Sequence, residues 1–335
     1  MGIRKSQGKT KKSVRPAAAI AVKRDEALPE APPRALSAMA KRRGFRILVA
    51  SDGSPSARVA LAMVTAFPWP RGTRVAAVVA IRGFVSSRGA DWPPAVWMAL
   101  QSAIERVRLG ARRRLRRRWP TAEVAVVDQP PAAAILGEAR RTGADVIVIG
   151  ARGLGALGRL VVGSVSRTVL RQATRPVLVV KGRPGPVRRF VLGLDGSRNA
   201  RRAVRFLAAM AAPPGGQVSV VRVSELARVP SMGLAPASVR ARVAEAVVEL
   251  NARTVLAARR DVQAAARRLV GAGWRVRPVL RAGVPLAELL KAVRAARADV
   301  LVLGARGVGG IARLLLGSVA EGAVSHAPVS VLIVK

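Results

Sequence analysis

Glycine and serine recur in this chain at two places with the same spacing. The pattern is a glycine, two residues, a second glycine, nine residues and then Gly-Ser, at Gly150, Gly153, Gly163 and Ser164 and again at Gly304, Gly307, Gly317 and Ser318. The first glycine of each set ends an apolar run, where the missing Cβ would let the backbone approach a ligand. The Gly-Ser pair opens a helical segment, whose free N–H groups and positive dipole end favour phosphate. The spacing therefore predicts two phosphate-binding loops.

Two other interpretations fit parts of this pattern. The glycines could be turn residues only, and Ser164 and Ser318 could be helix N-caps. Residues 153–158 also spell the G-x-G-x-x-G dinucleotide fingerprint, which expects an acidic residue about 20 positions later. No Asp or Glu stands between Asp145 and Asp195, and this absence argues against a dinucleotide site.

Charged side chains accompany both loops. Asp52 and Asp195 each follow an apolar run within an Asp-Gly-Ser triplet, without an acidic partner nearby in sequence. A single carboxylate of this kind suits a ribose or magnesium contact better than metal-centred catalysis. Arg152 and Arg306 lie inside the loops and could neutralise phosphates, although a solvent-facing loop arginine is an equally good interpretation.

The loops belong to a sequence that is written twice. The run Ala144 to Gly153 matches Ala298 to Gly307, and each copy alternates short Val/Ile/Leu-rich runs with longer Ala/Arg/Leu-rich helical segments. That alternation is typical of a parallel sheet covered by helices on both faces. Strands are predicted near 45–51, 75–81, 122–128, 145–150 and 176–181, and near 189–195, 217–223, 275–281, 299–304 and 328–334. The predicted fold class is α/β, with two doubly wound five-stranded parallel sheets in tandem, whose ligands bind at the carboxyl ends of the strands.

The repeat also sets the domain boundaries. Residues 1–44 are rich in Lys, Arg, Ala and Pro and are expected to form a disordered basic tail. The first domain is assigned to 45–183 and the second to 188–335. Copy two holds about eleven more residues than copy one between its Asp-Gly-Ser triplet and its glycine loop, and the long helical stretch Ser238 to Val270 is the predicted place for them.

Taken together, the strand-terminal aspartates, the doubled glycine loops and the final Pro-Val strands resemble the universal stress protein family. The resemblance covers residues 45 to 335 as two copies, and implies the adenine nucleotide alpha hydrolase-like fold with flavodoxin-like layering. It also implies an adenine-nucleotide site in each copy, with ATP, alone or with Mg²⁺, as the ligand. The implied contacts in copy one are Asp52, Ala80, Gly150, Arg152, Gly153, Gly163, Ser164, Val165 and Ser166. Those in copy two are Asp195, Val223, Gly304, Arg306, Gly307, Gly317, Ser318, Val319 and Ala320.

The two copies differ at one of these positions. Copy two has Ala320 where copy one has Ser166, so it lacks a hydroxyl in the first turn of the loop helix. The loss of one hydrogen bond, about 0.5 to 1.5 kcal/mol, is expected to weaken a site without abolishing it. Copy one is therefore expected to hold the fuller site. The family also implies that the two copies pack through their last strands, as an internal pair or in a homodimer.

Composition limits the function classes. The chain has no cysteine and one histidine, His326, which excludes thiol chemistry and multi-histidine metal sites. No catalytic or metal-ligating set is predicted, and the expected role is stress-linked sensing or regulation in the cytoplasm, without a membrane span and with slow ATP hydrolysis at most. An ATP-consuming enzyme remains a further hypothesis, tested by multiple-turnover release of phosphate.

Positive charge supports a different class of function. Lys and Arg number 59 against 18 Asp and Glu, a net charge of +41. The run from Arg112 to Arg118 places positive charge around most of a helix, and Trp119 follows it, either to stack on a base or to cover the core. The alternative hypothesis is a nucleic-acid-associated protein that binds through its tail and this helix, with the domains as scaffolds.

Overall fold

The computed structural model describes residues 44–81, 93–152, 162–182, 185–231, 233, 235–307 and 316–335. Residues 1–43 of the predicted tail, Gly153 and the rest of the dinucleotide-like segment lie outside the described residues. The elements of copy one are β1 Arg46–Ala50, α1 Pro55–Ala66, β2 Arg74–Ile81, α2 Pro94–Arg116, β3 Glu123–Asp128, α3 Pro131–Arg141, β4 Val146–Gly150, α4 Ser164–Gln172 and β5 Val177–Val180. Those of copy two are β6 Arg189–Leu194, α5 Arg198–Ala209, β7 Gln217–Ser224, α6 Ala237–Val270, β8 Arg275–Ala282, α7 Pro285–Ala295, β9 Val300–Gly304, α8 Ser318–His326 and β10 Ser330–Val334.

The strands form one continuous sheet in the order β3-β2-β1-β4-β5-β10-β9-β6-β7-β8. Pairing within each copy is parallel, which confirms the predicted doubly wound topology. The copies meet where β5 and β10 pair antiparallel, with Leu178 opposite Leu332. The expected packing through the last strands is therefore present within one chain. In each copy the strand order reverses between the first and fourth strands, β1 and β4 or β6 and β9, where sheets of this class bind ligands.

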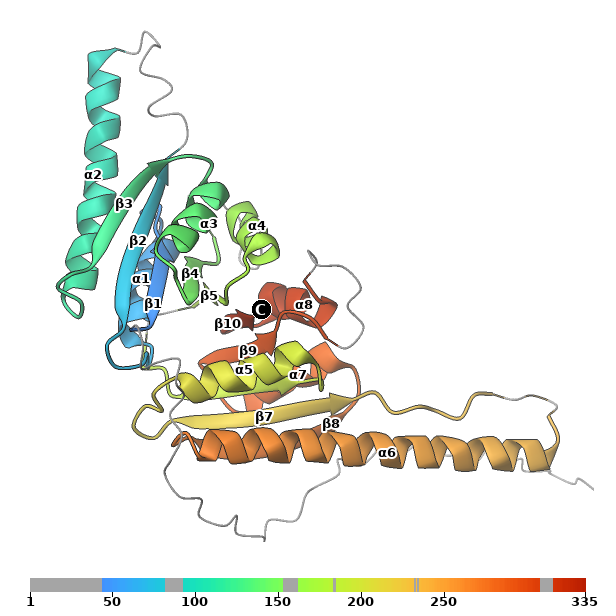
Figure 1. Cartoon of the computed structure of the whole chain (residues 1–335). Coiled ribbons are helices and arrows are strands. Elements are labelled where there is room, and N and C mark those ends of the chain that lie inside the picture. Colours follow the sequence, from blue (N-terminus) through green and yellow to red (C-terminus); the bar gives the residue numbers. More distant parts are fainter. Residues whose placement is uncertain are drawn as a thin grey trace, which may run out of the picture.

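Helices cover both faces of the sheet. Apolar residues of α1, α2, α5 and α6 pack on one face in a cluster that includes Leu61, Leu115, Leu207 and Leu269. Those of α3, α4, α7 and α8 pack on the other face in a second cluster. Figure 1 shows α3 and α4 beside one another on the same side of the copy-one strands. Because the central strands are covered on both sides, they are apolar along their whole length, as in Val146–Gly150.

Aromatic side chains help to join the two copies. The ring of Phe67 contacts that of Phe190 edge to face, with centroids 5.8 Å apart, and Phe45 contacts Phe206 at 6.0 Å. Each contact links a residue of copy one to a residue of copy two. Aromatic pairs of this geometry contribute about 0.5 to 1.5 kcal/mol beyond the area that they bury. A chain with only 3% aromatic residues thus uses four of them at this junction.

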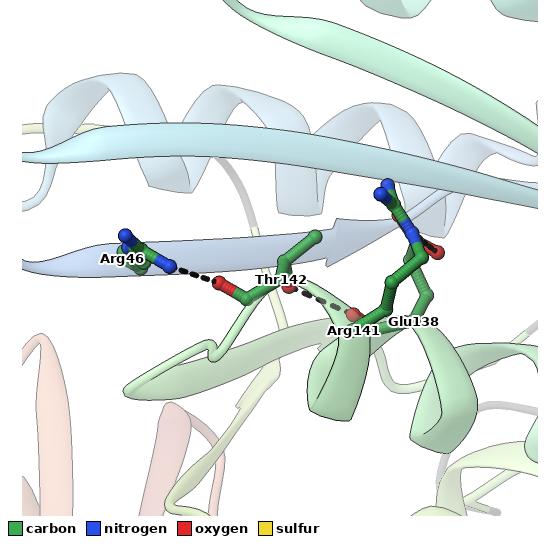
Figure 2. A network of polar contacts seen from close by, with 4 residues as sticks. All are labelled: Arg46, Glu138, Arg141 and Thr142. Atoms are coloured by element: carbon green, nitrogen blue, oxygen red, sulfur yellow. Dashed lines mark hydrogen bonds and ion pairs between the residues drawn. The ribbon is translucent and has the colours of Figure 1, made fainter.

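Polar contacts fix the amino ends of the strands. Asp145 Oδ2 accepts a hydrogen bond from the N–H of Arg46 at 2.8 Å, and Asp299 Oδ2 accepts from Arg189 N at 2.7 Å in the other copy. The guanidinium of Arg46 also donates to the carbonyl oxygen of Thr142 at 2.9 Å, at the end of α3 (Figure 2). These aspartates therefore anchor backbone at the sheet edge opposite the predicted site.

The second helix of each copy accounts for the length difference. The helix α6 has 34 residues and α2 has 23, so the predicted insertion of about eleven residues falls in α6 as expected. Both helices begin well before the part that packs on the sheet. Among the helices of the described part of the chain, none is both long enough and apolar enough to cross a membrane.

Candidate functional site

The Asp-Gly-Ser triplets form the same turn in both copies. Asp52 Oδ1 accepts from the N–H of Ser54 at 3.0 Å, and Ser54 Oγ caps α1 by accepting from Ala57 N at 3.1 Å. Gly53 has φ +78°, in the left-handed region that glycine adopts without strain. Copy two repeats these bonds with Asp195 and Ser197 at 2.9 and 3.0 Å. Each turn holds its aspartate at the carboxyl end of the first strand.

The helix α4 begins beside this turn. Gly163 is its N-cap residue, and the helix start has no side-chain cap. The first N–H groups of an α-helix have no carbonyl within the helix to bond, so those of Ser164, Val165 and Ser166 face outward from its start. The interpretation of Ser164 and Ser318 as N-caps is wrong, because Gly163 and Gly317 occupy that position.

The Gly163 amide does not belong to the cradle that the sequence predicted. Its N–H donates to the carbonyl oxygen of Ala151 at 2.8 Å, and Gly317 N donates to Ala305 O at 2.8 Å in copy two. These bonds close the glycine loop onto the end of the strand before it. The amides that remain for an anion start at Ser164 and Ser318, one residue later than expected.

Ser166 also has a partner within the fold. Its side chain is buried, and Oγ donates to the carbonyl oxygen of Gly150 at 2.8 Å. The hydroxyl therefore links the first turn of α4 to the end of β4 and is not held free for a phosphate. Ala320 is buried at the same position of copy two and lacks this link. The difference between the copies is thus a difference in how the helix is attached.

Gly150 and Gly304 are required for helix packing. A Cβ on Gly150 would lie 2.8 Å from the carbonyl carbon of Ser56, and one on Gly304 would lie 2.7 Å from that of Asn199. The first turns of α1 and α5 therefore occupy the space that the sequence interpretation gave to a ligand. Gly150 still lies beside the cavity described next, through its backbone.

A cavity of about 330 Å³ opens at the carboxyl ends of β1 and β4. It lies at the strand-order reversal of copy one and has the size of a small-molecule site. Eight of the nine residues predicted for copy one line it: Asp52, Ala80, Gly150, Arg152, Gly163, Ser164, Val165 and Ser166. The ninth, Gly153, lies outside the described residues.

The cavity has one polar side and one apolar side. Asp52, Arg152 and the start of α4 form the polar side. The apolar side contains residues that the sequence analysis missed: Ala50, Ala57, Val78, Pro131, Ile135 and Ile149, with Ser51 beside them. Pro131 and Ile135 come from the start of α3, and the Pro-Pro pair that follows the third strand was the signal that could have located them. Such a site suits a ligand with a flat apolar part and an anionic part.

A lysine lies near the loop arginine in each copy. Burial, and to a lesser extent the positive charge of Arg152, lowers the pKa of Lys181 from 10.5 to about 8. The ammonium donates to the carbonyl oxygen of Ala327 at 2.9 Å, across the junction between the copies. Lys335 repeats this arrangement, since burial and then Arg306 lower its pKa to about 8, and Nζ donates to Leu170 O at 2.6 Å. Each loop arginine therefore stands near a half-buried lysine that ties the two copies together.

In copy two the loop is held by side chains of α5 and its cap. Ser197 Oγ and Asn199 Nδ2 both donate to the carbonyl oxygen of Arg306, at 3.1 and 3.3 Å. A Cβ on Gly307 would lie 2.6 Å from Asp195 Oδ2, so the carboxylate lies against the loop backbone. The remaining predicted residues surround the same strand ends: Val223 is the second-last residue of β7, Gly304 ends β9, Gly317 caps α8, and Ser318, Val319 and Ala320 form its first turn.

Comparisons with known proteins agree on one family. A model described as the Universal stress protein family matches residues 45–181 and 186–335. "Universal stress protein Rv2005c" of Mycobacterium tuberculosis is 32% identical over 205 residues, which span 57% of this chain and 62% of that protein. "Universal stress protein in QAH/OAS sulfhydrylase 3'region" of Thermus aquaticus is 36% identical over 136 residues, 40% of this chain and 97% of that protein.

A solved structure gives the same fold. The crystal structure of a universal stress protein from Archaeoglobus fulgidus DSM 4304 superposes with a TM-score of 0.57, covering 87% of this chain and 98% of that one at 19% sequence identity. At that identity the match shows the shared fold. The chain spans less than two thirds of the length of the mycobacterial relative.

Proposed function

This chain belongs to the universal stress protein family, and from that premise we propose that copy one binds an adenine nucleotide, with ATP as the preferred ligand, to sense or transmit a stress signal. The observation that carries the proposal is the cavity in which Asp52, Arg152 and the start of α4 face an apolar wall. Family membership supports a role in the stress response.

The polar side of the cavity suits the ribose and phosphates. The amides of Ser164, Val165 and Ser166 and the positive end of the α4 dipole would receive phosphate oxygens, with Arg152 adding positive charge. Asp52 would accept a hydrogen bond from a ribose hydroxyl. Mg²⁺, which binds mainly through substrate phosphates and retained water, would need few protein ligands here, and Asp52 is the one carboxylate among the described lining residues.

The apolar side suits the base. Val78, Pro131 and Ile135 would cover the faces of an adenine ring, and the backbone near Ala80, at the end of β2, would meet its edge. The described lining includes no histidine, and Asp52, engaged with the Ser54 amide, is its one carboxylate. We therefore expect regulation through binding, with slow hydrolysis at most. Multiple-turnover release of phosphate or pyrophosphate would instead establish an ATP-consuming enzyme.

Proline substitution tests the amide cradle without disturbing the helix. Proline is well tolerated at the first position of a helix, and Gly163 has φ −62° and ψ 155°, which a following proline accepts. Ser164→Pro therefore removes the Ser164 N–H, whereas Ser164→Ala removes the hydroxyl alone. Hydrogen bonds to charged groups are worth about 1.5 to 3 kcal/mol, so Ser164→Pro should weaken ATP affinity about 10-fold or more. Ser318→Pro makes the same change in copy two.

The result separates several outcomes. Weaker binding by Ser164→Pro, with Ser164→Ala close to the wild type, supports an amide cradle in copy one. Weaker binding by Ser318→Pro alone would place the site in copy two. Equal affinity of all four proteins, measured by calorimetric titration, would contradict a cradle at either helix.

A nucleic-acid-associated role is the second candidate, because the end of α2 presents the exposed residues Arg113, Arg114 and Arg116, followed by the exposed C-cap residue Arg117. Trp119 is buried and its ring contacts the Arg118 guanidinium. Its side chain therefore packs in the core and is not available to stack on a base. This candidate predicts DNA or RNA affinity that falls steeply with salt and is unchanged by ATP or Ser164→Pro. Salt-resistant or absent binding would count against it.

A further inference from the structure

The outer edge of β3 carries a cleft that nucleotide binding does not use. β3 is the last strand of the sheet on the copy-one side and, among the described strands, pairs with β2 alone. Figure 1 shows it at the outer end of the copy-one strands, beside α2. A cleft of about 290 Å³ is lined by the first half of β3 together with residues of β2, α2 and α3. None of the described residues that line it also lines the cavity beside Asp52, so the edge is a separate candidate site.

Copy two has a proline at the equivalent edge. Pro278 of β8 lies opposite Val220, and Val124 of β3 lies opposite Ala77, at the same register of the two copies. Proline has no N–H, so inside a strand it is accommodated where its nitrogen faces away from the neighbouring strand. Position 124 therefore directs its N–H and carbonyl groups outward, as does Val126, because backbone groups alternate in direction along a strand. Copy one thus keeps an outward N–H at the position where copy two lacks one.

Three arginines of α2 lie along this cleft. Arg108, Arg112 and Arg116 line it, and the last two directly follow the buried residues Ala111 and Leu115. Positions four residues apart rise about 6 Å along an α-helix. Alternate residues of an extended strand, whose side chains share one face, are about 6.6 to 6.8 Å apart. A strand added to β3 can therefore present every second side chain to a successive arginine.

Arg112 and Arg116 carry the charge that remains for a ligand. Arg108 is held by Glu105, to which its Nε and Nη2 donate at 2.7 and 2.6 Å. Arg112 is half-buried and within electrostatic range of Glu105, and Arg116 is exposed. Neither of these two arginines forms an ion pair with another described residue. This side of the cleft therefore favours an anionic ligand.

We propose that the β3 edge binds an extended acidic segment of a partner protein, which adds to the sheet as a further strand. Alternate Asp or Glu side chains of this segment pair with Arg112 and Arg116, and its backbone bonds the outward groups of Val124 and Val126. Val126 is 40% exposed, and the added strand covers it. In this mode of recognition the backbone bonds supply affinity, and the positions of the side chains supply specificity.

Charge disfavours the other occupants of this edge. Residues 1–43 of the chain are strongly basic, so the arginines repel them. A second copy would bring its own row of arginines to the same edge. Glu123 and Glu138 also line the cleft, and Glu138 accepts bonds of 2.8 and 2.5 Å from Arg141. These carboxylates repel a continuous phosphate chain, whereas a peptide carries negative charge only where the α2 arginines stand.

Fluorescence anisotropy of labelled peptides, titrated with the nuclease-treated full chain, provides the test. The probe is an eight-residue peptide of alternating Glu and Val with blocked ends, and its control has four Glu followed by four Val. Both carry the same charge, but only the alternating peptide places all its carboxylates on one face of a strand. It should bind about 10-fold more tightly than the control, or better. Equal affinities would mean attraction by net charge alone and would overturn the proposal.

Charge reversal on α2 locates the bound peptide. Arg112→Glu combined with Arg116→Glu should weaken binding of the alternating peptide about 10-fold or more, because two attractions become repulsions. Arg113→Glu combined with Arg114→Glu makes the same charge change at exposed residues outside the cleft lining. This control should lose less than about 3-fold at 0.15 M salt, where charges are screened beyond about 8 Å. Equal losses in the two variants would contradict binding in the cleft.

Proline substitution tests the backbone bonds. Val124→Pro removes the outward N–H and introduces the residue that copy two has at this register. It should weaken peptide binding about 5-fold or more, whereas Val124→Thr keeps the N–H and should bind as the wild type does. Unchanged binding by Val124→Pro would overturn the added strand.

The same question can be asked with the protein unchanged. Of two alternating peptides, one N-methylated at every Glu and the other at every Val, one should lose binding and the other keep it, because only alternate amides of an added strand face β3. Equal binding of both would contradict strand addition. A labelled oligothymidylate that binds more tightly than the alternating peptide, and loses binding in the Arg112→Glu and Arg116→Glu variant, would assign the cleft to nucleic acid instead.

Discussion

Ser166 Oγ donates a 2.8 Å hydrogen bond to the carbonyl oxygen of Gly150, and this bond fixes the first turn of α4 against the end of β4. The two residues are 16 positions apart in sequence, on either side of the glycine loop. The bond therefore holds the helix start where its free amides border the cavity.

Ser166→Ala should destabilise the chain by about 1 to 2 kcal/mol, because it removes the donor of a buried carbonyl oxygen. Ser164→Ala, at an exposed neighbouring serine, should change stability by less than about 0.5 kcal/mol. Urea unfolding of the two variants measures both values. Equal stability would show that the Ser166 bond contributes nothing.

Gly150→Ala should destabilise the chain by about 1 to 3 kcal/mol, because the new Cβ would overlap the backbone of Ser56 in α1. Gly110→Ala is the matched control, since nothing lies within 4 Å of a Cβ at that position inside α2. Alanine should there stabilise by about 0.5 to 1 kcal/mol. Thermal unfolding of the pair should give shifts of opposite sign, and shifts of the same sign would refute the packing account.

Arg222 and Asp261 are half-buried polar residues of copy two that lie near Gly196. A Cβ added to Gly196 would lie 3.0 Å from Asp261 Oδ2 and 3.5 Å from Arg222 Nη1. A Cβ added to the equivalent Gly53 of copy one would contact the side chain of Val107 instead. Within the described part of the chain, Arg222 Nε and Nη1 are buried without a hydrogen-bond partner. By strand register, the copy-one counterpart of Arg222 is Val79.

We expect Asp261→Val alone to destabilise by no more than about 1 kcal/mol, because Asp261 and Arg222 are both half-buried and lie near one another without a direct ion pair. The double variant Arg222→Val with Asp261→Val should recover wild-type stability or exceed it by about 1 kcal/mol, because it also removes the Arg222 nitrogens that are buried without a hydrogen-bond partner. A double-mutant cycle from urea unfolding gives the coupling between the two side chains. Additive effects of the single changes would mean that the residues act independently.

Stability should rise with pH between about 8 and the unfolded-state pKa of lysine. Lys181 and Lys335 have folded-state pKa values lowered from 10.5 to about 8 by burial, so in that interval the unfolded chain binds more protons than the folded one. Free energy of unfolding therefore increases with pH there. Lys181→Met should flatten this part of the profile, while Lys291→Met, at an exposed lysine on α7, should leave it unchanged. Identical profiles would contradict the burial effect.

Much of the fold could be predicted because the apolar runs are bounded by clear signals. β4 ends at Gly150 and β9 at Gly304, and Asp-Gly-Ser follows β1 and β6, so the strand ends were located to within a few residues. The sequence repeat then predicted the second domain and located the additional residues of copy two in α6. These features depend on local sequence, which is why they were accessible.

The partners of individual site atoms could not be predicted in this way. The Gly163 amide bonds Ala151 O, and Asn199 bonds Arg306 O from 107 positions away, so both depend on how the elements pack. The same holds for Ile135, whose place in the cavity follows from the position of α3 on the sheet. The spacing of the glycines and serines indicated the correct edge of the sheet. It did not indicate which N–H groups at that edge already donate hydrogen bonds within the fold.

Hydrogen–deuterium exchange of the full chain, with and without saturating ATP, tests the central claim most directly. Helix-start amides without intrahelical partners exchange readily until a ligand binds them. We predict slower exchange on ATP binding in peptides covering Asp52 and the segment from Ser164 to Ser166, with no change along α2. Unchanged exchange at α4 with ATP bound, or protection confined to the arginine-rich end of α2, would contradict a nucleotide site in copy one.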